Sequence, residues 1–561
     1  MILDNRFWLM WAMPIVASFF SVDVQMGGVA TTLWHALKVA FYGFLVFYVF
    51  YFLLSFIKPQ GLVRFLKNAM LVLSLSLTFI DFFVSYYFHM GFTPSLVGTL
   101  LATNVRESQE FLTSMVLPRL GFILGYLATC VGFLYLVRFK LCLNMPQRLK
   151  TLVILFGLFW VHILSTYYLQ GLHGVFIDPN ITTRVIPVVK EVSAIIENFK
   201  DNQTKAIYQS FKQPYPKDYV HVDANSVPNV ILVVGESASR NFMNLYGYRV
   251  PNTPLLSEIA KHRSQNLFVF DNVISVFANT YTVFRTLLNY GDVENHAGPW
   301  FQQKNLGRIF NLAGYKTFWI DAQDNLDGNN VFAFLAHPFT HKYWANGPLD
   351  IQNSTQDGWT LEVFKHHVEP QLASKNFILF HLFGSHAIYH RRFPKSFAKF
   401  SPTQIPYENL HVQDNADKQI VADYVNSLYY TDYILHEIFQ FFSMQDAIIL
   451  YLSDHAEDVF ESDRNYGHRC STYGVEIPFV IYVTDLFKQK RPQKVRQLAQ
   501  AVHKPFMSDD LIHTLLPLAG IHTKDSLESK DLLSPRFDAM RRRTYCGNQY
   551  PSDTLKIPTN R

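Results

Sequence analysis

Charged residues and cysteines are scarce in this chain. Asp, Glu, Lys and Arg together make up only 17% of its 561 residues, and the formal net charge is +5. So small a charge on so long a chain gives no indication of nucleic-acid binding. None of the four cysteines belongs to a Cys-x-x-Cys pair, which excludes the common zinc-finger and thiol-redox motifs. Cys470 and Cys546 could form a disulfide in an oxidising compartment, or they could be two unrelated thiols.

Hydrophobic residues are abundant, at 49%, and they are unevenly distributed. Up to about Leu169 the chain consists of apolar runs broken by short polar loops, whereas from about Asp178 its composition is that of a water-soluble domain. A chain of this length is expected to form at least two units. We therefore predict a transmembrane bundle over residues 1–171, an amphipathic linker over 172–226 and a soluble domain over 227–561.

Five apolar stretches are about as long as the ~20 residues that a membrane-spanning helix needs. They cover residues 7–22, 34–57, 69–88, 116–137 and 149–169. The loops after the second and fourth stretches carry the basic residues Lys58, Arg64, Lys67, Arg138, Lys140, Arg148 and Lys150. Loops rich in Lys and Arg stay in the cytoplasm. Five spans then predict a multi-pass inner-membrane protein, in contact with membrane lipids, whose soluble domain lies in the periplasm of a Gram-negative cell.

The linker contains one segment with helical periodicity. Apolar residues recur at helical spacing, namely Val185, Val188, Val189, Val192, Ile195, Ile196 and Phe199. The opposite face carries Lys190, Glu191 and Asn198. This helix could lie on the membrane or pack on the soluble domain. We favour packing on the domain, because helices that bind membrane surfaces have a polar face richer in basic residues.

The soluble part alternates short β-branched runs with helical segments. The runs cover residues 229–235, 267–275, 316–320, 376–382, 447–453 and 477–483, and the helical segments include 306–313 and 420–442. This alternation predicts a mostly parallel sheet with helices on both faces. Ligands of such folds bind at the carboxyl ends of the strands.

Polar residues with metal-binding chemistry follow several of these runs. Glu236 follows the first run, and Asp454 and His455 follow the fifth. Each alone has an ordinary explanation, as a charge at a helix start, a cap or a surface histidine. Together, at one edge of a sheet, they favour zinc, which binds nitrogen and oxygen ligands and keeps one position open in catalytic sites.

The residues around these candidates resemble a known family. The motif Gly235-Glu236-Ser237-x-x-Arg240, the downstream segments 245–248 and 252–254, and Ser453-Asp-His-Ala-Glu457 are similar to motifs of the phosphoethanolamine transferases. These enzymes modify lipopolysaccharide and belong to the alkaline phosphatase/sulfatase superfamily. The resemblance extends over nearly the whole chain, and the five-span anchor matches as well.

The resemblance implies a fold, a cofactor and a set of roles. The fold is a five-helix transmembrane bundle followed by an alkaline phosphatase-like α/β/α sandwich with a mostly parallel central sheet. Zn²⁺ is bound by Glu236, Thr280, Asp454 and His455, and Thr280 is the nucleophile that forms a phosphothreonine intermediate. The remaining site residues contact substrate: His386 and His468 bind its phosphate, and Thr103 and Glu107 bind the headgroup. The donor is phosphatidylethanolamine and the acceptor is lipopolysaccharide.

Departures from the family pattern bear on the acceptor. Ala278-Asn279 stands where enzymes acting on lipid A have Cys-Gly, and the segment 384–389 resembles the branch that modifies inner-core sugars. We therefore favour a core sugar over lipid A. A phosphoglycerol transferase or another superfamily enzyme, and an inactive membrane scaffold, stay as alternatives. A sulfatase is disfavoured because no Cys/Ser-x-Pro-x-Arg motif adjoins the second run.

A few neighbouring residues have open roles. Thr282 is a rival nucleophile to Thr280. His381 is expected either in the core or in contact with the metal ligands, and Glu457 either supports the metal ligands or marks a helix start. His390, with Arg391 and Arg392, forms a basic cluster that could meet anionic lipopolysaccharide or could be a solvated loop.

Overall fold

The computed structural model describes residues 1–20, 28–88, 90–103, 105–176, 185–201, 204–294, 298–323, 331–345 and 356–551. The chain divides into two compact units. The first contains residues 1–101 and 111–201, and the second contains residues 102–110 and 202–561.

The first unit is helical. Its main helices are α1 (Asn5–Ser18), α3 (Gly28–Leu54), α4 (Gln60–Phe88), α5 (Pro94–Ala102), α7 (Leu120–Leu136), α8 (Met145–Phe176) and α9 (Pro187–Asp201). Four stretches of the described residues are long and apolar enough to cross a membrane, and they suggest membrane anchoring: Val29–Leu54, Gln60–Phe88, Ser108–Leu136 and Met145–Tyr168. The count of five is not confirmed. The first predicted span, residues 7–22, corresponds to α1, which has 14 residues, and its predicted last residues, 21 and 22, lie outside the described part of the chain.

The predicted amphipathic helix exists, but it belongs to the helical first unit and not to the soluble domain on which we favoured its packing. Helix α9 belongs to the first unit and packs against α4. Its polar face points inward, where Lys190 forms an ion pair with Asp81 at 2.5 Å and Glu191 is fully buried. Its apolar residues Ile196 and Phe199 are exposed. The polar face of α9 points inward because α4 presents buried polar side chains of its own, among them Asp81.

The second unit is built on a seven-stranded sheet. The strand order is β5-β13-β10-β4-β9-β7-β8. The bounds are β5 Leu267–Phe270, β13 Phe479–Val483, β10 Ala447–Ser453, β4 Asn229–Gly235, β9 Asn376–His381, β7 Lys316–Asp321 and β8 His341–Trp344. Strand β13 runs antiparallel to both of its neighbours, β10 and β5, and the other neighbouring pairs are parallel. The prediction of a mostly parallel sheet is therefore confirmed.

Two details of the sheet differ from the pattern in the sequence. Strand β8 was not predicted, because its four residues form no apolar run and lie at the edge of the sheet. The run 267–275 is interrupted, so that β6 (Val273–Ile274) leaves the main sheet and pairs with β14 (Phe506–Met507). The segment leading to Thr280 thus follows a short separate strand pair.

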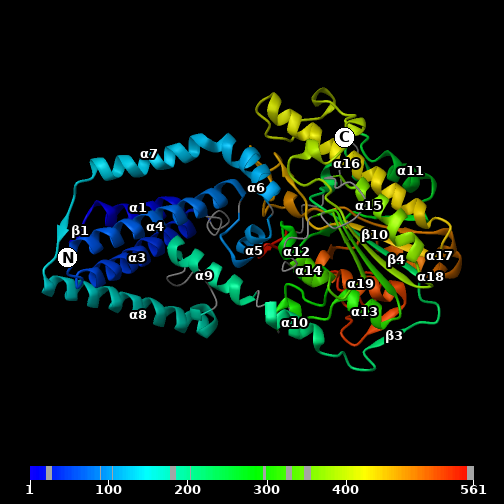
Figure 1. Cartoon of the computed structure of the whole chain (residues 1–561), viewed down its shortest axis with the longest axis horizontal. Helices are drawn as coiled ribbons and strands as arrows, with labels where there is room; N and C mark the ends of the chain where they lie inside the picture. The colour runs from blue at the N-terminus through cyan, green and yellow to red at the C-terminus, as the bar shows by residue number, and fades with distance from the viewer. Residues whose placement is uncertain are drawn as a thin grey trace. The chain divides into compact units, whose positions relative to one another are not determined.

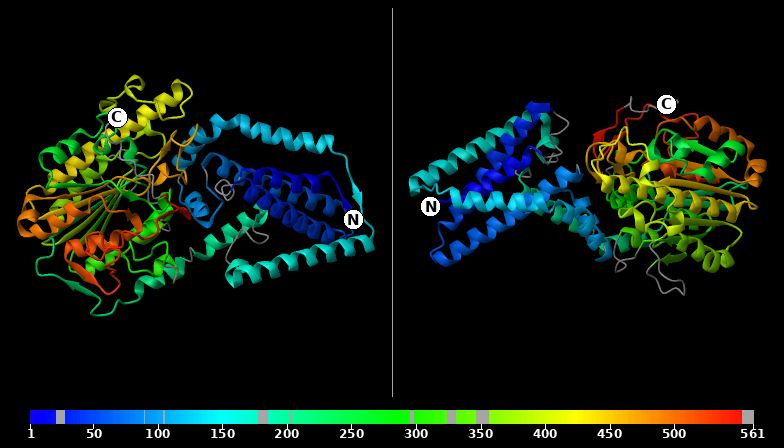
Figure 2. Two further views of the ribbon diagram at one scale, coloured as in Figure 1. Left: turned by 180° about the vertical axis from the view of Figure 1, so that it is seen from behind. Right: turned by 90° about the horizontal axis from the view of Figure 1, so that it is seen from above.

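Helices cover both faces of the sheet (Figure 1). One face carries α12 (Thr280–Leu287), α13 (Leu306–Leu312), α14 (Val331–Ala336) and α19 (Leu511–Ala519). The other carries α11 (Pro254–His262), α15 (Gly358–Val363) and α16 (Asn415–Phe442). Strand β4 shows why both faces need cover, because its side chains are apolar on both sides. Val230 and Leu232 pack against the first helical layer, and Ile231 and Val233 pack against the second. The turned views in Figure 2 show the same three layers, the predicted α/β/α sandwich.

The cysteines of the second unit are paired. Cys470 and Cys546 form a disulfide across 76 residues of sequence, which decides the alternative that the sequence left open. Cys130 and Cys142 are free thiols, the first buried and the second exposed.

Candidate active site and metal centre

Strand register brings the first candidate residues together. Strands β4 and β10 are adjacent and parallel, and Gly235 is paired with Ser453 in their ladder. Glu236 and Asp454, the next residues along each strand, therefore leave the sheet side by side. Both are almost completely buried, as is His455. This is the carboxyl edge of the sheet, where the sequence predicts a ligand site.

Four potential metal ligands converge at this edge. The Thr280 hydroxyl lies 2.9 Å from Glu236 Oε2 and 3.3 Å from His455 Nε2. His455 Nε2 is 3.3 Å from Glu236 Oε1 and 3.4 Å from Asp454 Oδ2. One ligand atom from each of Glu236, Asp454 and His455 lies within 4.8 Å of the others. The predicted set of three ligands and a nucleophile is thus assembled by the fold.

The donor atoms at this point fit zinc. Asp454 Oδ1 accepts hydrogen bonds from the Ser237 and His455 amides, whereas Oδ2 is buried and has no hydrogen-bond partner among the described residues. His455 Nδ1 lies 3.0 Å from the Ala456 carbonyl. With a proton on Nδ1 for that carbonyl, Nε2 keeps a free lone pair pointing at the carboxylates. Two carboxylates, one imidazole and a hydroxyl are a donor set that suits Zn²⁺.

The electrostatics of the group also favour a cation. Burial raises the pKa of Asp454 to about 6, and the neighbouring charge of Glu236 adds to this effect. Burial alone would lower the pKa of His455, but the charges of Asp454 and Glu236 raise it to about 10. Two buried carboxylates therefore draw a proton onto the imidazole when no metal ion balances them.

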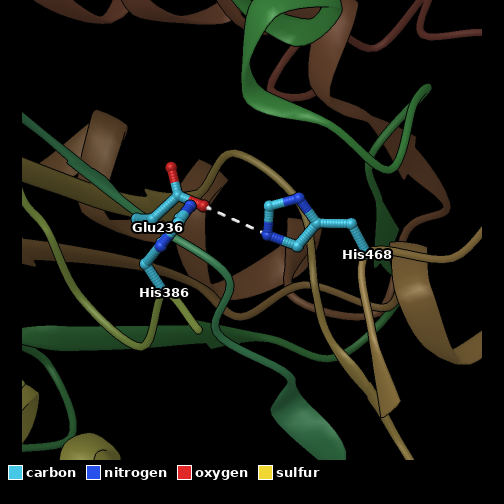
Figure 3. A group of neighbouring side chains, drawn as sticks. All are labelled: Glu236, His386 and His468. Atoms are coloured by element: carbon cyan, nitrogen blue, oxygen red, sulfur yellow. Dashed lines mark ion pairs between the residues drawn. The ribbon is translucent and has the colours of Figure 1, made fainter. Parts of the chain in front are cut away.

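A second group of side chains adjoins the first. Glu236, His386 and His468 have ligand atoms within 4.8 Å of one another, and Figure 3 shows both imidazoles directed towards the carboxylate. His468 Nε2 lies 3.1 Å from the Ser237 hydroxyl and 3.1 Å from Glu457 Oε1. Burial lowers the pKa of His386 to about 3, so this ring is neutral at physiological pH. The two histidines thus adjoin the same carboxylate that accepts from the Thr280 hydroxyl.

Local hydrogen bonding distinguishes the two threonines. Asn279 caps α12, and its side-chain oxygen accepts from the Thr282 amide at 3.0 Å and from the Thr282 hydroxyl at 2.7 Å. Thr282 is thereby bound within the cap, whereas the Thr280 hydroxyl faces Glu236. The geometry favours Thr280 as the reacting group.

Some contributors were missed or only partly recognised in the sequence. Ser237 adopts a left-handed backbone conformation, with φ of 61°, and its hydroxyl donates to Glu236 Oε1 at 2.6 Å. A non-glycine residue in this region of φ is strained, and such strain concentrates at functional sites. The buried His381 pairs with Asp321 at 2.9 Å, and Gln323 joins the pair to Glu236. The only signal for these residues was their position after strands.

The structure describes the side chain of only one of the two candidate headgroup-binding residues, Thr103 and Glu107. Thr103 is half-buried between α5 and α6 (Val105–Phe111). Glu107 lies in α6, but its side chain is outside the described part of the structure. Their predicted contact with a headgroup stays a prediction.

Substituting Gly384 tests how closely the loop that carries His386 must pack against Glu236. Its φ is +52°, and an added Cβ would lie 2.5 Å from the Glu236 carbonyl oxygen and 2.9 Å from its amide nitrogen. We expect Gly384→Ala to displace Glu236, to lower zinc content measurably and to lower transfer by about tenfold or more. Metal analysis of the purified variant, with its activity, measures this effect.

Gly314→Ala is the matched control, because Gly314 also has a positive φ, of +82°, but has no atom within 4 Å of the added Cβ. Backbone strain alone would cost the two variants a similar ~1–3 kcal/mol. Equal zinc content in both variants would show that the approach of Gly384 to Glu236 has no role in the site.

The second unit has an alkaline phosphatase-like fold with a candidate metal centre at the carboxyl edge of its sheet. Residues 228–521 match the family model described as Sulfatase, and the chain belongs to this family. Among curated proteins it is 26% identical over 489 residues to phosphoethanolamine transferase EptC of Escherichia coli O18:K1:H7, covering 84% of this chain and 82% of that one. It is 24% identical to phosphoethanolamine transferase CptA of Salmonella typhimurium, covering 84% and 83%. The resemblance seen in the sequence is confirmed.

Solved structures agree with this assignment. The C-terminal periplasmic domain of EptC from Escherichia coli, in complex with Zn, matches 60% of this chain and 93% of that domain, with 26% identity and a TM-score of 0.53. The integral membrane lipooligosaccharide phosphoethanolamine transferase A from Neisseria meningitidis matches 96% of this chain and 99% of its own, with 19% identity and a TM-score of 0.62. The second match shows a common fold over both units.

Proposed function

We propose that this chain is a zinc-dependent phosphoethanolamine transferase that uses phosphatidylethanolamine as donor and lipopolysaccharide as acceptor. The observation that carries the proposal is the Thr280 hydroxyl, which lies against Glu236 and His455 beside Asp454 in a chain similar over most of its length to phosphoethanolamine transferases. The segment 384–389 supports a core sugar rather than lipid A as the acceptor.

In the proposed reaction Thr280 is the nucleophile. Its oxygen forms a bond to the donor phosphorus, the bond from phosphorus to the diacylglycerol oxygen breaks, and diacylglycerol leaves with a proton. An acceptor hydroxyl or phosphate then attacks the phosphothreonine, and the Thr280 oxygen is released. A covalent intermediate divides one difficult transfer into two displacements.

The surrounding side chains have separate tasks in this scheme. Glu236, Thr280, Asp454 and His455 would hold zinc, which as a Lewis acid stabilises negative charge on oxygen and lowers the pKa of a bound hydroxyl. Glu236 Oε2 accepts the hydrogen bond of the Thr280 hydroxyl and so orients its oxygen. His468, supported by Ser237 and Glu457, would donate to phosphoryl oxygens.

His386 has a different proton state from its neighbour. Because burial lowers its pKa to about 3, the ring is neutral and offers one donor and one acceptor nitrogen to the substrate. Its unprotonated nitrogen can accept a hydrogen bond from the attacking acceptor hydroxyl while the other nitrogen donates to a phosphoryl oxygen, which orients the acceptor; a pKa this low makes the ring too weak a base to take the proton itself. We assign this role to His386.

The proposed cellular arrangement follows from the first unit. Helix α1 would be the fifth crossing beside the four long apolar helices, and the basic loops would face the cytoplasm. In this arrangement the protein would lie in the inner membrane with its catalytic unit in the periplasm, and the periplasmic location of the similar EptC domain supports this. Thr103 and Glu107 would then bind the donor headgroup.

Mass spectrometry of lipopolysaccharide tests the proposal. A strain lacking the gene should lack one phosphoethanolamine group on its lipopolysaccharide, and the wild-type gene should restore the group. The Asp454→Asn variant, which loses a metal ligand, should not. Fragmentation locates the group on a core sugar or on lipid A. Unchanged lipopolysaccharide would overturn the assigned acceptor, and a phosphoglycerol group in its place would overturn the assigned donor.

A further inference from the structure

A buried ion pair links helix α6 to the loop that carries His386. Glu110 Oε2 lies 2.7 Å from Arg392 Nη2, and both residues belong to the second unit. Arg392 is fully buried and Glu110 is 5% exposed. The sequence suggested that Arg392 belongs to a surface cluster, and this is wrong. The neighbouring Arg391 reaches the other carboxylate oxygen at 2.8 Å, but its side chain is 51% exposed.

Arg392 in turn fixes the backbone beside His386. Its Nε donates to the His386 carbonyl at 3.1 Å, and its Nη2 donates to the Ala387 carbonyl at 2.8 Å. Its guanidinium carbon lies 4.0 Å from the centre of the Phe383 ring. One cation therefore contacts three residues of the turn that follows β9, and it donates hydrogen bonds to the backbone carbonyls of two of them.

The start of the same turn is held by Asp357. The Asp357 carboxylate accepts from the Phe383 amide at 2.6 Å and from the Gly384 amide at 2.9 Å. Phe383 and Gly384 are thus held by Asp357, and His386 by Arg392. Arg392 also contacts a residue outside residues 202–561, namely Glu110.

A fully buried guanidinium needs a counter-charge, because an unpaired charge in the interior is strongly destabilising. Glu110 supplies that charge from a segment, residues 102–110, that also contains Thr103 and Glu107. The segment expected to hold the donor headgroup is therefore the segment that neutralises Arg392.

We propose that Glu110 and Arg392 are positioning residues that set His386 for catalysis, so that the His386 turn is ordered only when Glu110 of α6 contacts Arg392. The inference rests on the role proposed above for His386. The segment expected to bind the headgroup then has a second task. The contact of its Glu110 with Arg392 also fixes the position of His386. Without Glu110, the Arg392 cation loses the carboxylate that contacts it at 2.7 Å, and the turn loses its fixed position.

The enzymatic test uses the full-length protein with a phosphatidylethanolamine donor. Glu110→Gln should lower kcat by about 10- to 100-fold, since misplacement of a catalytic group by about 1 Å costs that much. The KM for the donor and the zinc content should stay within about twofold, and Glu110→Asp should recover part of the loss. Arg391→Ala is the matched control, because it removes only the exposed ion pair between Arg391 and Glu110. The kcat of this variant should stay near that of the wild type.

The His386→Ala background separates positioning from a general structural effect. If Glu110 acts through His386, adding Glu110→Gln to His386→Ala should lower kcat by less than about twofold. An equal loss in both backgrounds, or a parallel loss of zinc, would overturn the inference. Near-normal activity of His386→Ala alone would overturn the proposed role of His386 and the inference with it.

Hydrogen exchange gives a readout that does not depend on activity. Backbone amides of residues 383–392 should exchange faster in Glu110→Gln than in the wild type or in Arg391→Ala, while those of β10 should be unchanged. Unchanged exchange in residues 383–392 would overturn the inference even if the transferase assignment stands. Faster exchange there would support it even if the protein transfers a different group.

Discussion

Thr280→Ala will abolish phosphoethanolamine transfer and leave the protein folded. Thr280 begins α12, and its hydroxyl lies 2.9 Å from Glu236 Oε2. No other hydroxyl among the described residues is assigned to attack the donor, so we expect activity to fall by on the order of a thousandfold or more, as when a nucleophile is removed from other covalent enzymes. The transfer assay measures the loss, and a thermal melt verifies the fold.

The neighbouring threonine provides the control for this substitution. Thr282 is hydrogen-bonded to the Asn279 cap, so Thr282→Ala should cost about 1 kcal/mol of stability and little activity. In the absence of acceptor, the wild type should accumulate one phosphoethanolamine group on the peptide that contains Thr280. Near-normal transfer by Thr280→Ala, with loss in Thr282→Ala, would reassign the nucleophile.

Removing zinc should destabilise the protein, and more so at high pH. Binding of an ion at about a thousand times its Kd raises the unfolding free energy by about 4 kcal/mol, which corresponds to a rise in Tm on the order of 10 °C. The ligands bind zinc in their deprotonated forms, so this stabilisation grows as the pH rises. We expect the Tm difference between zinc-loaded and metal-free protein to be clearly larger at about pH 8.5 than at about pH 5.5.

The pKa directions determine the sign of this effect. Burial and the charge of Glu236 raise the pKa of Asp454 to about 6 from 3.8, so its contribution to the stability of the metal-free fold is lost as the pH rises through about 6. Burial lowers the pKa of His455, but Asp454 and Glu236 raise it from 6.5 to about 10, so its contribution is lost as the pH rises from about 6.5 towards 10. Burial would raise the pKa of Glu236, yet the hydrogen bond and charge of His455 hold it well below 4.5, outside the range tested.

A substitution at the same site provides the control. Asp454→Asn removes one buried charge and one metal ligand, so the metal-free variant should lose stability less steeply with pH and should gain little from zinc. Thermal melts of the wild type and of Asp454→Asn, each with and without zinc, give four Tm values at each pH. A zinc-dependent rise in Tm that is equal at both pH values, or larger at about pH 5.5, would contradict the assignment of these ligands.

The sequence was sufficient for features that depend on local composition. The apolar runs 229–235 and 447–453 are long and β-branched, and they became β4 and β10 with the predicted bounds. Glu236 and Asp454 could be placed at one edge because parallel strands end at the same edge of a sheet. The membrane half was recognisable in the same way, since apolar length needs no tertiary context.

Features that depend on a distant partner were not readable. The polar face of α9 points inward because α4 presents Asp81 to Lys190, and a helical pattern states only that two faces exist. Arg392 is buried because Glu110, 282 residues earlier in the chain, neutralises it, whereas adjacent basic residues indicate a surface cluster.

For the protein as a whole, the sequence by itself determined the strands, the apolar spans and the residue types that meet at the carboxyl edge of the sheet. Only the tertiary structure decided which of two threonines faces Glu236, that Cys470 pairs with Cys546, and that the turn of His386 is tied to Glu110. The physical reason is that composition and periodicity act over a few residues, while hydrogen bonds, disulfides and buried ion pairs join atoms that only the folded chain brings within reach.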